Sequence, residues 1–334
     1  MNQKKINVVQ YGLGPIGLQI TRYLLERKIF KIVGAIDIDS QKVGKDLGTV
    51  AGLNKKFGVK ISSDAEKVLK NSRADIVVLT TTSSLKKIKP QILQIVSHSK
   101  DVVSTCEELM YPWLTSPKIA KEIDSAAKRK NVSVLSTGIN PGFLMDFLPM
   151  ALTAVCKDVK KITVERIQNA KYRRIPFQKK IGAGLTTDQF DQKVKDGTLR
   201  HVGLTESVHL IASKLGWKLD KTQDIIGPVI AVKNVSAGKI KIGKGNALGV
   251  QQTGLGIKNG EEKIKLLFRA TIGEKSPRDR IIVDSVPPID MIIKNGVNGD
   301  VATCAITINA IPVVLNANPG LRTMADIEPV SCFI

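Results

Sequence analysis

Cysteine, histidine and aromatic residues are scarce in this chain of 334 residues. It has four cysteines and three histidines, and Phe, Trp and Tyr together make up 4%. The cysteines lie far apart, form no Cys-x-x-Cys pair and have no neighbouring histidine. This pattern excludes a compact disulfide framework and a zinc site, and it is typical of a reducing compartment, so we expect a cytoplasmic protein without a metal.

Long apolar runs are absent, and acidic residues are few relative to basic ones. No run approaches the roughly 18 apolar residues that cross a bilayer, and the first residues lack a signal-peptide pattern, so we expect no membrane partner. The 51 Lys and Arg residues exceed the 30 Asp and Glu residues, which gives a formal charge of +21. Because the basic residues are spread out and not interleaved with aromatics, we expect a surface that steers anionic small molecules and does not bind nucleic acid.

The first 140 residues alternate between short apolar strands and amphipathic helices. The predicted strands are residues 5–11, 31–36, 75–79, 101–105 and 132–135. Predicted helices begin near Ile16, Asp64, Ser84 and Pro117. Strands that are apolar on both faces and alternate with helices indicate a parallel sheet covered on both sides, an α/β fold.

A glycine motif follows the first predicted strand. Its residues are Gly12-Leu13-Gly14-Pro15-Ile16-Gly17, which match G-x-G-x-x-G, and Asp37 ends the second strand. The first glycine permits a tight turn, the second lets backbone N–H groups approach a pyrophosphate, and the third lets the helix pack on the strand. The context predicts a Rossmann dinucleotide-binding domain over residues 1–140, with all six motif residues and Asp37 in contact with the cofactor.

The acidic residue at the end of the second strand bears on the choice of cofactor. The carboxylate of Asp37 can accept hydrogen bonds from both ribose hydroxyls of NAD and would repel a 2′-phosphate. We therefore expect NAD. Ser40 and Lys42 just downstream could accommodate a phosphate, so NADP stays possible.

Polar residues also end the later strands, where ligands of open parallel sheets bind. In the segment 80–83, Thr81 and Thr82 are expected to contact ribose or phosphate; the alternative is a helix cap made by Ser83 or Ser84. Thr105-Cys106-Glu107-Glu108-Leu109 places two adjacent carboxylates at the mouth of the site. Because neighbouring side chains alternate in direction, we expect one of them to face the nicotinamide; the alternative is a pair of surface acids.

The second half is predicted to be an α+β domain built on a mainly antiparallel sheet. It has a strand at 161–167, helices near Thr187 and Thr205, and a hairpin turn at Asn259-Gly260. Val301–Leu315 is predicted as a helix kinked by Pro312. We expect this substrate and dimerisation domain to span 141–309, with the segment from about 310 to 334 returning to the first domain. Its exposed sheet face suggests a homodimer.

Five segments together resemble a known family across essentially the full chain. They are residues 103–109, 137–143, 173–184, 201–207 and 318–324. They are similar to 2,4-diaminopentanoate dehydrogenases and to native NAD(P)-dependent amine dehydrogenases. The first domain is also similar to dihydrodipicolinate reductases, but the His-His pair and nearby Lys of those enzymes are absent here, so we reject that activity.

The resemblance implies reversible reductive amination, in which a ketone (a keto acid or an amino ketone), ammonia and NAD(P)H give a primary amine. A carboxylate suits this chemistry because it stabilises a cationic iminium and relays protons. Glu107 aligns with the catalytic Lys of homoserine dehydrogenases and of sugar-oxidising dehydrogenases, so it is the predicted catalytic residue, with Glu108 in reserve. Cys106 is counted with the cofactor-binding residues, and Asn140 is expected to hold the nicotinamide.

The expected substrate-binding residues are less clearly marked. Phe143 and Tyr172 are expected to shape the pocket, while Arg166 and His201 are expected to bind a carboxylate or another polar end of the substrate. Arg173-Arg174 could also hold an anion. A lone Arg or His is more often structural, and the sequence leaves that alternative open.

Two other functions compete with amine dehydrogenation. An alcohol- or aldehyde-directed NAD(P)-dependent oxidoreductase could share the scaffold, although the absence of Lys at positions 107 and 108 counts against it. A nucleotide-sensing protein that uses its basic surface on nucleic acid is the more distant alternative. Dependence of NADH consumption on ammonia would distinguish an amine dehydrogenase from the alcohol- or aldehyde-directed enzyme. Nucleic-acid binding whose affinity falls steeply with salt would indicate the nucleotide-sensing protein.

Overall fold

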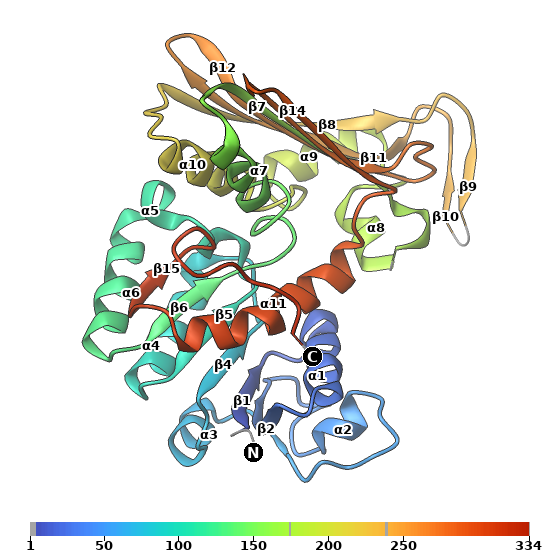
Figure 1. The fold of residues 1–334 in the computed structure, drawn as a ribbon. Helices are drawn as coiled ribbons and strands as arrows, with labels where there is room; N and C mark the ends of the chain where they lie inside the picture. Colours follow the sequence, from blue (N-terminus) through green and yellow to red (C-terminus); the bar gives the residue numbers. More distant parts are fainter. Residues whose placement is uncertain (1–4, 174, 238–239, 334) are drawn as a thin grey trace. The chain divides into compact units, whose positions relative to one another are not determined.

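The chain forms two compact units, seen in a computed structural model that describes residues 5–173, 175–237 and 240–333 (Figure 1). Unit 1 comprises Met1–Phe143 together with Gly299–Ile334, and unit 2 comprises Leu144–Asn298. The last helix, α11 (Gly299–Leu315), lies whole within unit 1 because it packs on α1 and on strands of the first sheet. The chain thus returns to the first unit at Gly299, whereas the sequence suggested about residue 310.

A seven-stranded parallel sheet forms the centre of unit 1, which confirms the predicted Rossmann fold. Its strands are β1 (Ile6–Tyr11), β2 (Phe30–Ile36), β3 (Ile61–Ser62), β4 (Ile76–Leu79), β5 (Asp101–Ser104), β6 (Ser133–Ser136) and β15 (Gly320–Arg322). Their order is β15-β6-β5-β4-β1-β2-β3, and every pair is parallel. The carboxyl ends of β1, β4, β5 and β6 therefore share one edge of the sheet.

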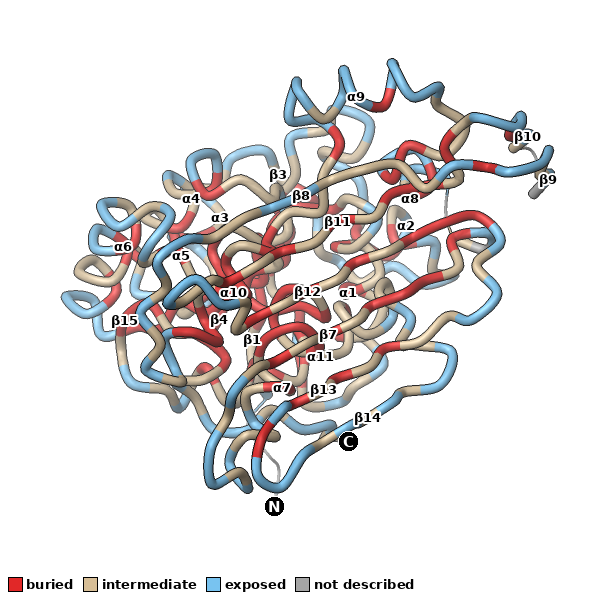
Figure 2. Tube along the Cα trace, turned by 90° about the horizontal axis from the view of Figure 1, so that it is seen from above, coloured by how far each residue is buried: buried red, intermediate tan, exposed pale blue. Residues whose placement is uncertain are grey.

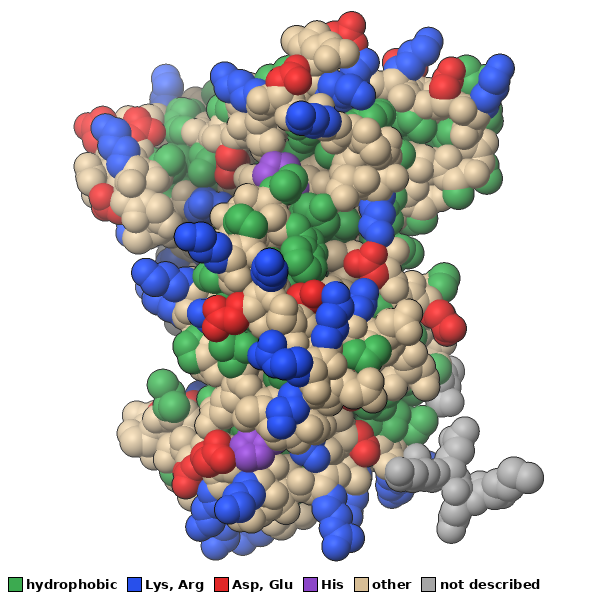
Figure 3. Space-filling view, turned by 90° about the vertical axis from the view of Figure 1, so that its left-hand side faces the viewer, with side chains coloured by type: hydrophobic (Ala, Val, Ile, Leu, Met, Phe, Trp, Pro, Cys, Tyr) green, Lys and Arg blue, Asp and Glu red, His purple; other side chains and the backbone are tan. Residues whose placement is uncertain are grey.

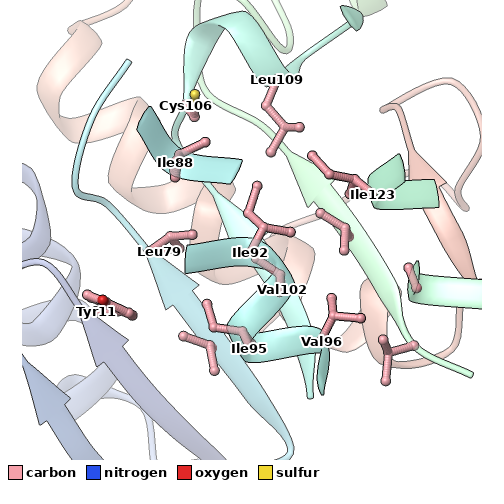
Figure 4. Close-up of a cluster of buried hydrophobic side chains, with 14 of the residues drawn as sticks. Tyr11, Leu79, Ile88, Ile92, Ile95, Val96, Val102, Cys106, Leu109 and Ile123 are labelled. Atoms are coloured by element: carbon pink, nitrogen blue, oxygen red, sulfur yellow. The ribbon is translucent and has the colours of Figure 1, made fainter. Parts of the chain in front are cut away.

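Helices cover both faces of this sheet because its strands are apolar on both sides. They are α1 (Pro15–Glu26), α2 (Leu47–Val50), α3 (Ala65–Asn71), α4 (Leu85–Ser97), α5 (Pro112–Thr115), α6 (Pro117–Arg129), α11 and the 3₁₀ turn η1 (Glu107–Leu109). The helices α4 and α6 pack together on one face, and α1 packs with α11 on the other (Figure 1). Ile88, Ile92 and Ile95 of α4 are buried at helical spacing against Leu79 and Val102 (Figure 4).

Unit 2 is built on a six-stranded sheet in the order β14-β13-β7-β12-β11-β8. The strands are β7 (Asp158–Asn169), β8 (Lys221–Ile230), β11 (Ala247–Lys258), β12 (Glu261–Thr271), β13 (Arg278–Val286) and β14 (Ile289–Lys294), and a separate two-stranded sheet pairs β9 (Val235–Ala237) with β10 (Ile240–Ile242). Within the large sheet β7 and β12 are parallel and the other pairs are antiparallel, which confirms a mainly antiparallel second domain.

The local signals of the second half are largely confirmed. Asn259 and Gly260 join β11 to β12 with φ of 53° and 76°, the left-handed values that a tight hairpin turn needs. The helices of unit 2 are α7 (Phe147–Leu152), α8 (Ile175–Lys180), α9 (Thr187–Lys195) and α10 (Leu204–Lys214), with 3₁₀ turns η2 (Thr153–Val155) and η3 (Ala170–Tyr172). The helix α7 begins at Phe147, where the Asp146 carboxylate accepts the Phe147 N–H at 2.6 Å.

One face of the six-stranded sheet is buried and the other is more open. Along β7, β12 and β13 buried residues alternate with partly exposed ones, as expected for strands covered by helices on one side (Figure 2). The buried side packs on α10, where Gly254 lets Leu204 approach the sheet.

The surface is basic without a single concentrated patch in the view of Figure 3, where Lys and Arg side chains are interspersed with Asp and Glu. Within the described ranges, no helix combines the length and the apolar character needed to cross a bilayer.

Candidate active site

The glycine motif forms a loop with an open concave side. A Cβ atom on Gly12, whose φ is +93°, would lie 2.8 Å from the Thr80 carbonyl oxygen, and one on Gly17 would lie 2.0 Å from the Gly12 carbonyl oxygen. A Cβ on Gly14 would meet nothing within 4 Å. The protein therefore needs glycine at the first and third positions for its own packing, while the space over the second is free for a ligand.

The start of α1 completes an anion-binding geometry above this loop. Gly14 is the N-cap residue, Pro15 begins the helix, and no side chain caps the first turn. Unsatisfied N–H groups and the positive end of the helix dipole attract a phosphate. Gly14, Pro15 and Ile16 are at least partly exposed, whereas Gly12, Leu13 and Gly17 are buried. The loop is open over Gly14, Pro15 and Ile16, while Gly12, Leu13 and Gly17 support the turn. Contact of the cofactor with the six motif residues stays a prediction.

Two polar side chains, the buried Gln10 and the half-buried Thr80, hold the loop from beneath. Thr80 Oγ1 donates to the Gly12 carbonyl oxygen at 2.8 Å, and Gln10 Nε2 donates to the same oxygen at 3.0 Å. The sequence did not single out Thr80, although its position directly after β4, next to β1 in the sheet, could have indicated it. Thr81 instead donates to Gln91 at 2.6 Å and Thr82 accepts from the Ser84 N–H at 3.2 Å, so their contact with the cofactor stays a prediction.

Asp37 lies at the carboxyl end of β2, next to the same loop. One carboxylate oxygen accepts the Leu13 N–H at 2.7 Å and the other accepts the Asp39 N–H at 2.9 Å. Lys42 Nζ is 3.6 Å from Asp37 and 3.1 Å from Asp39. The carboxylate is therefore fixed beside the glycine loop, where the ribose of a bound dinucleotide would come.

We predict that Gly14→Val weakens binding of NADH at least about tenfold while the protein folds normally. The Cβ atom of the new side chain would meet no protein atom within 4 Å, and the side chain would fill the space that the ligand needs. Fluorescence titration with NADH measures the Kd, and thermal unfolding measures stability. Gly227→Val is the matched control, because a Cβ on that glycine also meets nothing within 4 Å but the residue lies in unit 2. Unchanged affinity in Gly14→Val would place the dinucleotide elsewhere.

The two adjacent glutamates after β5 have different environments. Glu108 Oε2 accepts the Leu85 N–H at 2.8 Å and so caps the first turn of α4, where Ser84 provides no side-chain cap. The Glu107 carboxylate forms no hydrogen bond or ion pair with any residue that the structure describes. Glu107 lines a polar hollow at the carboxyl edge of the sheet.

The hollow lies wholly within unit 1 and gathers residues from three places in the chain. It is lined by Thr105, Glu107, Ser136, Thr137, Gly138, Asn140, Pro141 and Thr303. The predicted residues Glu107 and Asn140 are thus brought together. The sequence missed Thr137, which follows β6, and Thr303, which α11 contributes. Thr303 lies within an apolar run and carries no local signal.

Buried hydroxyls fix the backbone that carries Glu107. Ser136 Oγ donates to the Cys106 carbonyl oxygen at 2.6 Å, and Ser104 Oγ accepts the Cys106 N–H at 3.1 Å. Cys106 itself is fully buried, and its thiol lies in the apolar core (Figure 4). Burial, reinforced by the Glu107 charge, raises the pKa of this thiol. The structure corrects the expectation that Cys106 contacts the cofactor, since the residue exposes no surface to a ligand.

Arg166 is a structural residue rather than a substrate ligand. Its side chain is 2% exposed, and its guanidinium donates to both Asp279 carboxylate oxygens at 2.8 and 2.9 Å and to the Val297 carbonyl oxygen at 3.1 Å. The expected role in binding a substrate carboxylate is therefore corrected. A buried guanidinium requires a paired charge, and Asp279 supplies it from the neighbouring strand β13.

The position and the pKa of His201 are determined by the residues that pack around it. Its ring packs on Phe268 with centroids 4.2 Å apart, and Gln252 bonds both its N–H, at 2.6 Å, and its carbonyl oxygen, at 3.0 Å. Burial, with smaller contributions from nearby cations such as Lys180, lowers the pKa of His201 to about 3. The ring is thus neutral near pH 7 and offers hydrogen bonds but no positive charge, so its role in substrate binding stays a prediction.

The remaining candidates are not brought into a described site. Phe143 is partly buried at the end of the first segment of unit 1. Arg173 lies over the Phe177 ring at 4.2 Å and donates to Gln168 at 3.2 Å. The side chain of Tyr172 and the whole of Arg174 lie outside the described residues.

We predict that Arg166→Met lowers the free energy of unfolding by about 3–5 kcal/mol, because it leaves the Asp279 carboxylate buried without a counter-ion. Replacing both partners, Arg166→Met with Asp279→Leu, should recover most of that loss. Chemical denaturation of the three proteins measures the effect. A single variant of normal stability with a raised KM for substrate would instead restore Arg166 as a ligand.

The fold and the glycine loop define the class of this protein as an NAD(P)-binding oxidoreductase. Residues 6–106 match the family model of the dihydrodipicolinate reductase N-terminus. Residues 143–334 match that of the 2,4-diaminopentanoate dehydrogenase C-terminal domain. The chain is 35% identical to 2,4-diaminopentanoate dehydrogenase from Acetoanaerobium sticklandii, over 97% of this chain and 94% of that protein. The chain belongs to the 2,4-diaminopentanoate dehydrogenase family.

Two amine dehydrogenases are more distant relatives. One, from Streptomyces virginiae, is 22% identical over 96% of both chains. The solved structure of the other, from Mycobacterium smegmatis, has a TM-score of 0.86 with 23% identity, over 98% of this chain and 97% of that one. At that identity the structural likeness shows a common fold.

Proposed function

We propose that this protein is an NAD(P)-dependent amine dehydrogenase that interconverts a primary amine with the corresponding ketone and ammonia. Its proposed substrates are small amines of the 2,4-diaminopentanoate type. The carboxylate of Glu107 carries this proposal, since it lines a polar hollow without a counter-ion at the sheet edge that also holds the glycine loop. The names of the relatives support the same reaction class.

The nicotinamide, when bound, supplies a hydride in amination and accepts one in deamination. Glycine loop residues 12–17 and Asp37 would hold the dinucleotide. Asp37 favours NAD, because its carboxylate would repel a 2′-phosphate, while Lys42 beside it leaves NADP usable. These residues therefore fit the cofactor. The remaining chemistry is stabilisation of positive charge and proton transfer at the substrate.

Glu107 is proposed to manage the charge and protons of the substrate. Ammonia adds to the ketone to give a carbinolamine, whose hydroxyl leaves as water after it takes a proton from the carboxylic acid form of Glu107. The resulting iminium is cationic at its C=N group. The regenerated carboxylate stabilises this positive charge by electrostatic attraction, which water screens weakly inside the hollow. Deamination runs these steps in reverse, with the same residue as general base and acid.

The function is tested by NADH and NADPH consumption with a panel of keto acids, simple ketones and the ketone derived from 2,4-diaminopentanoate, each with and without ammonium. Ammonium-dependent consumption supports amine dehydrogenation. Reduction that proceeds equally well without ammonium would indicate an alcohol-forming oxidoreductase.

We predict that Glu107→Gln lowers the kcat of amination by at least about 10²-fold, because the amide neither carries charge nor moves a proton. The Kd of NADH should stay nearly unchanged. Glu108→Gln is the neighbouring comparison, because its amide oxygen can still accept the Leu85 N–H. Larger loss of kcat in Glu108→Gln than in Glu107→Gln would transfer the catalytic role to Glu108.

We also propose a homodimer formed through the open face of the six-stranded sheet. One row across that face runs Ile225-Thr253-Leu267-Glu165-Arg280-Ile292 in register. Its end residues Ile225 and Ile292 are 55% and 51% exposed, which is unfavourable for an isolated sheet face. Sedimentation velocity should show a dimer, and Ile225→Lys with Ile292→Lys should shift it to monomer. A monomeric wild-type protein would contradict the proposal.

A cytoplasmic location is proposed as well. All four cysteines, Cys106, Cys156, Cys304 and Cys332, are free thiols, which suits a reducing compartment. Cell fractionation with an antibody against the protein tests this, and recovery in an oxidising compartment would contradict it.

A further inference from the structure

Two threonine hydroxyls in the polar hollow have unused hydrogen-bonding capacity. Thr137 is 3% exposed, and its Oγ1 is buried without a hydrogen-bond partner among the described residues. Thr303 Oγ1 accepts the Ile139 N–H at 3.4 Å and donates to no residue of the described ranges. The two come from the end of β6 and from α11, yet both line the hollow that Glu107 enters.

The buried Thr137 hydroxyl without a partner is unfavourable and calls for an explanation, because nearly all buried polar groups in native proteins are hydrogen-bonded. Thr303 is partly exposed, and its hydroxyl hydrogen is unused. Simple helix packing does not explain Thr303, whose hydroxyl is not bonded to the carbonyl one turn earlier. Thr307, one turn later on the same helix, shows the ordinary arrangement, with its hydroxyl donating to the Thr303 carbonyl oxygen at 2.7 Å. Among the lining hydroxyls, Ser136 is already bonded to the Cys106 carbonyl oxygen, whereas those of Thr137 and Thr303 are available to a ligand.

The charge of the hollow indicates which ligand. Its lining includes one carboxylate, Glu107, and no Lys, Arg or His. A carboxylate without a cation, next to hydroxyl oxygens with free lone pairs, is complementary to a small cation that carries several N–H donors. The described residues contain no cluster of His, Cys, Asp and Glu that could hold a metal ion, so a nitrogen cation fits better.

We propose that Thr137, Thr303 and Glu107 form the binding site for the reacting nitrogen, as ammonium in amination and as the substrate ammonium group in deamination. The proposal rests on the amine dehydrogenase function. The hydroxyl oxygens of Thr137 and Thr303 accept N–H bonds and orient the nitrogen. Glu107 takes one proton from ammonium, which leaves neutral ammonia with a lone pair for the ketone carbon and produces the carboxylic acid that later protonates the departing hydroxyl.

Steady-state kinetics with varied ammonium chloride tests the assignment. Thr137→Val and Thr303→Val keep the side-chain shape but remove the hydroxyl, and each should raise the KM for ammonium about tenfold, the effect of losing one hydrogen bond to a charged group. The KM for ketone and the Kd of NADH should change less than about twofold. Thr137→Ser and Thr303→Ser should restore the KM for ammonium.

Thr307→Val is the matched control, because it removes a hydroxyl from the same helix that is already bonded within that helix. It should leave the KM for ammonium unchanged. An unchanged KM for ammonium in both Thr137→Val and Thr303→Val, in an enzyme that does aminate, would overturn the site. A wild-type protein without any ammonium-dependent turnover would instead overturn the proposed function.

A readout without turnover covers the case in which the valine variants fold poorly. Rubidium has nearly the size of ammonium and scatters anomalously, so crystals of the wild-type enzyme with NAD, soaked in rubidium chloride, should show a peak in contact with Glu107 and Thr137. The Glu107→Gln crystals should lose it. A wild-type hollow that binds no rubidium under these conditions would count against a cation site.

Discussion

Parallel strand pairing is the constraint on which the whole site depends. The register of β1 with β4, and of β4 with β5, brings the residues after each strand to one edge of the sheet. Gly12, Thr80 and Glu107 lie far apart in the sequence, yet each follows one of these strands. Backbone hydrogen bonds in the sheet therefore set the spacing between the glycine loop and the proposed catalytic carboxylate, and side-chain contacts adjust it.

Short side-chain hydrogen bonds then hold the backbone of the loops at this edge of the sheet. Gln10 and Thr80 hold the Gly12 carbonyl, while Ser104 and Ser136 hold the backbone before Glu107. These groups are largely excluded from solvent, where hydrogen bonds are stronger and an unmade one costs more. Preorganised polar groups are what a charge-developing reaction needs.

The second unit shows how burial changes the meaning of a charged residue. An arginine such as Arg166 commonly binds a substrate carboxylate, but here its guanidinium is paired with the carboxylate of Asp279 in the same unit. His201 has the residue type of a proton carrier, but burial keeps it neutral near pH 7. Arg166 is therefore paired within the interior of its own unit, and His201 offers hydrogen bonds but no positive charge. The type of a residue indicates which chemistry its side chain could perform. Its burial and its partners determine whether a ligand can contact that side chain.

The sequence by itself determined the alternation of strands and helices, the glycine loop with Asp37, and the hairpin at Asn259-Gly260, because these follow from local periodicity and backbone conformation. Only the tertiary structure decided which of two adjacent glutamates enters the hollow, since Glu108 is fixed by a helix end 23 residues earlier in the chain. Only the tertiary structure brought Thr303 to the hollow. Such choices depend on contacts between distant segments, and no local pattern encodes them.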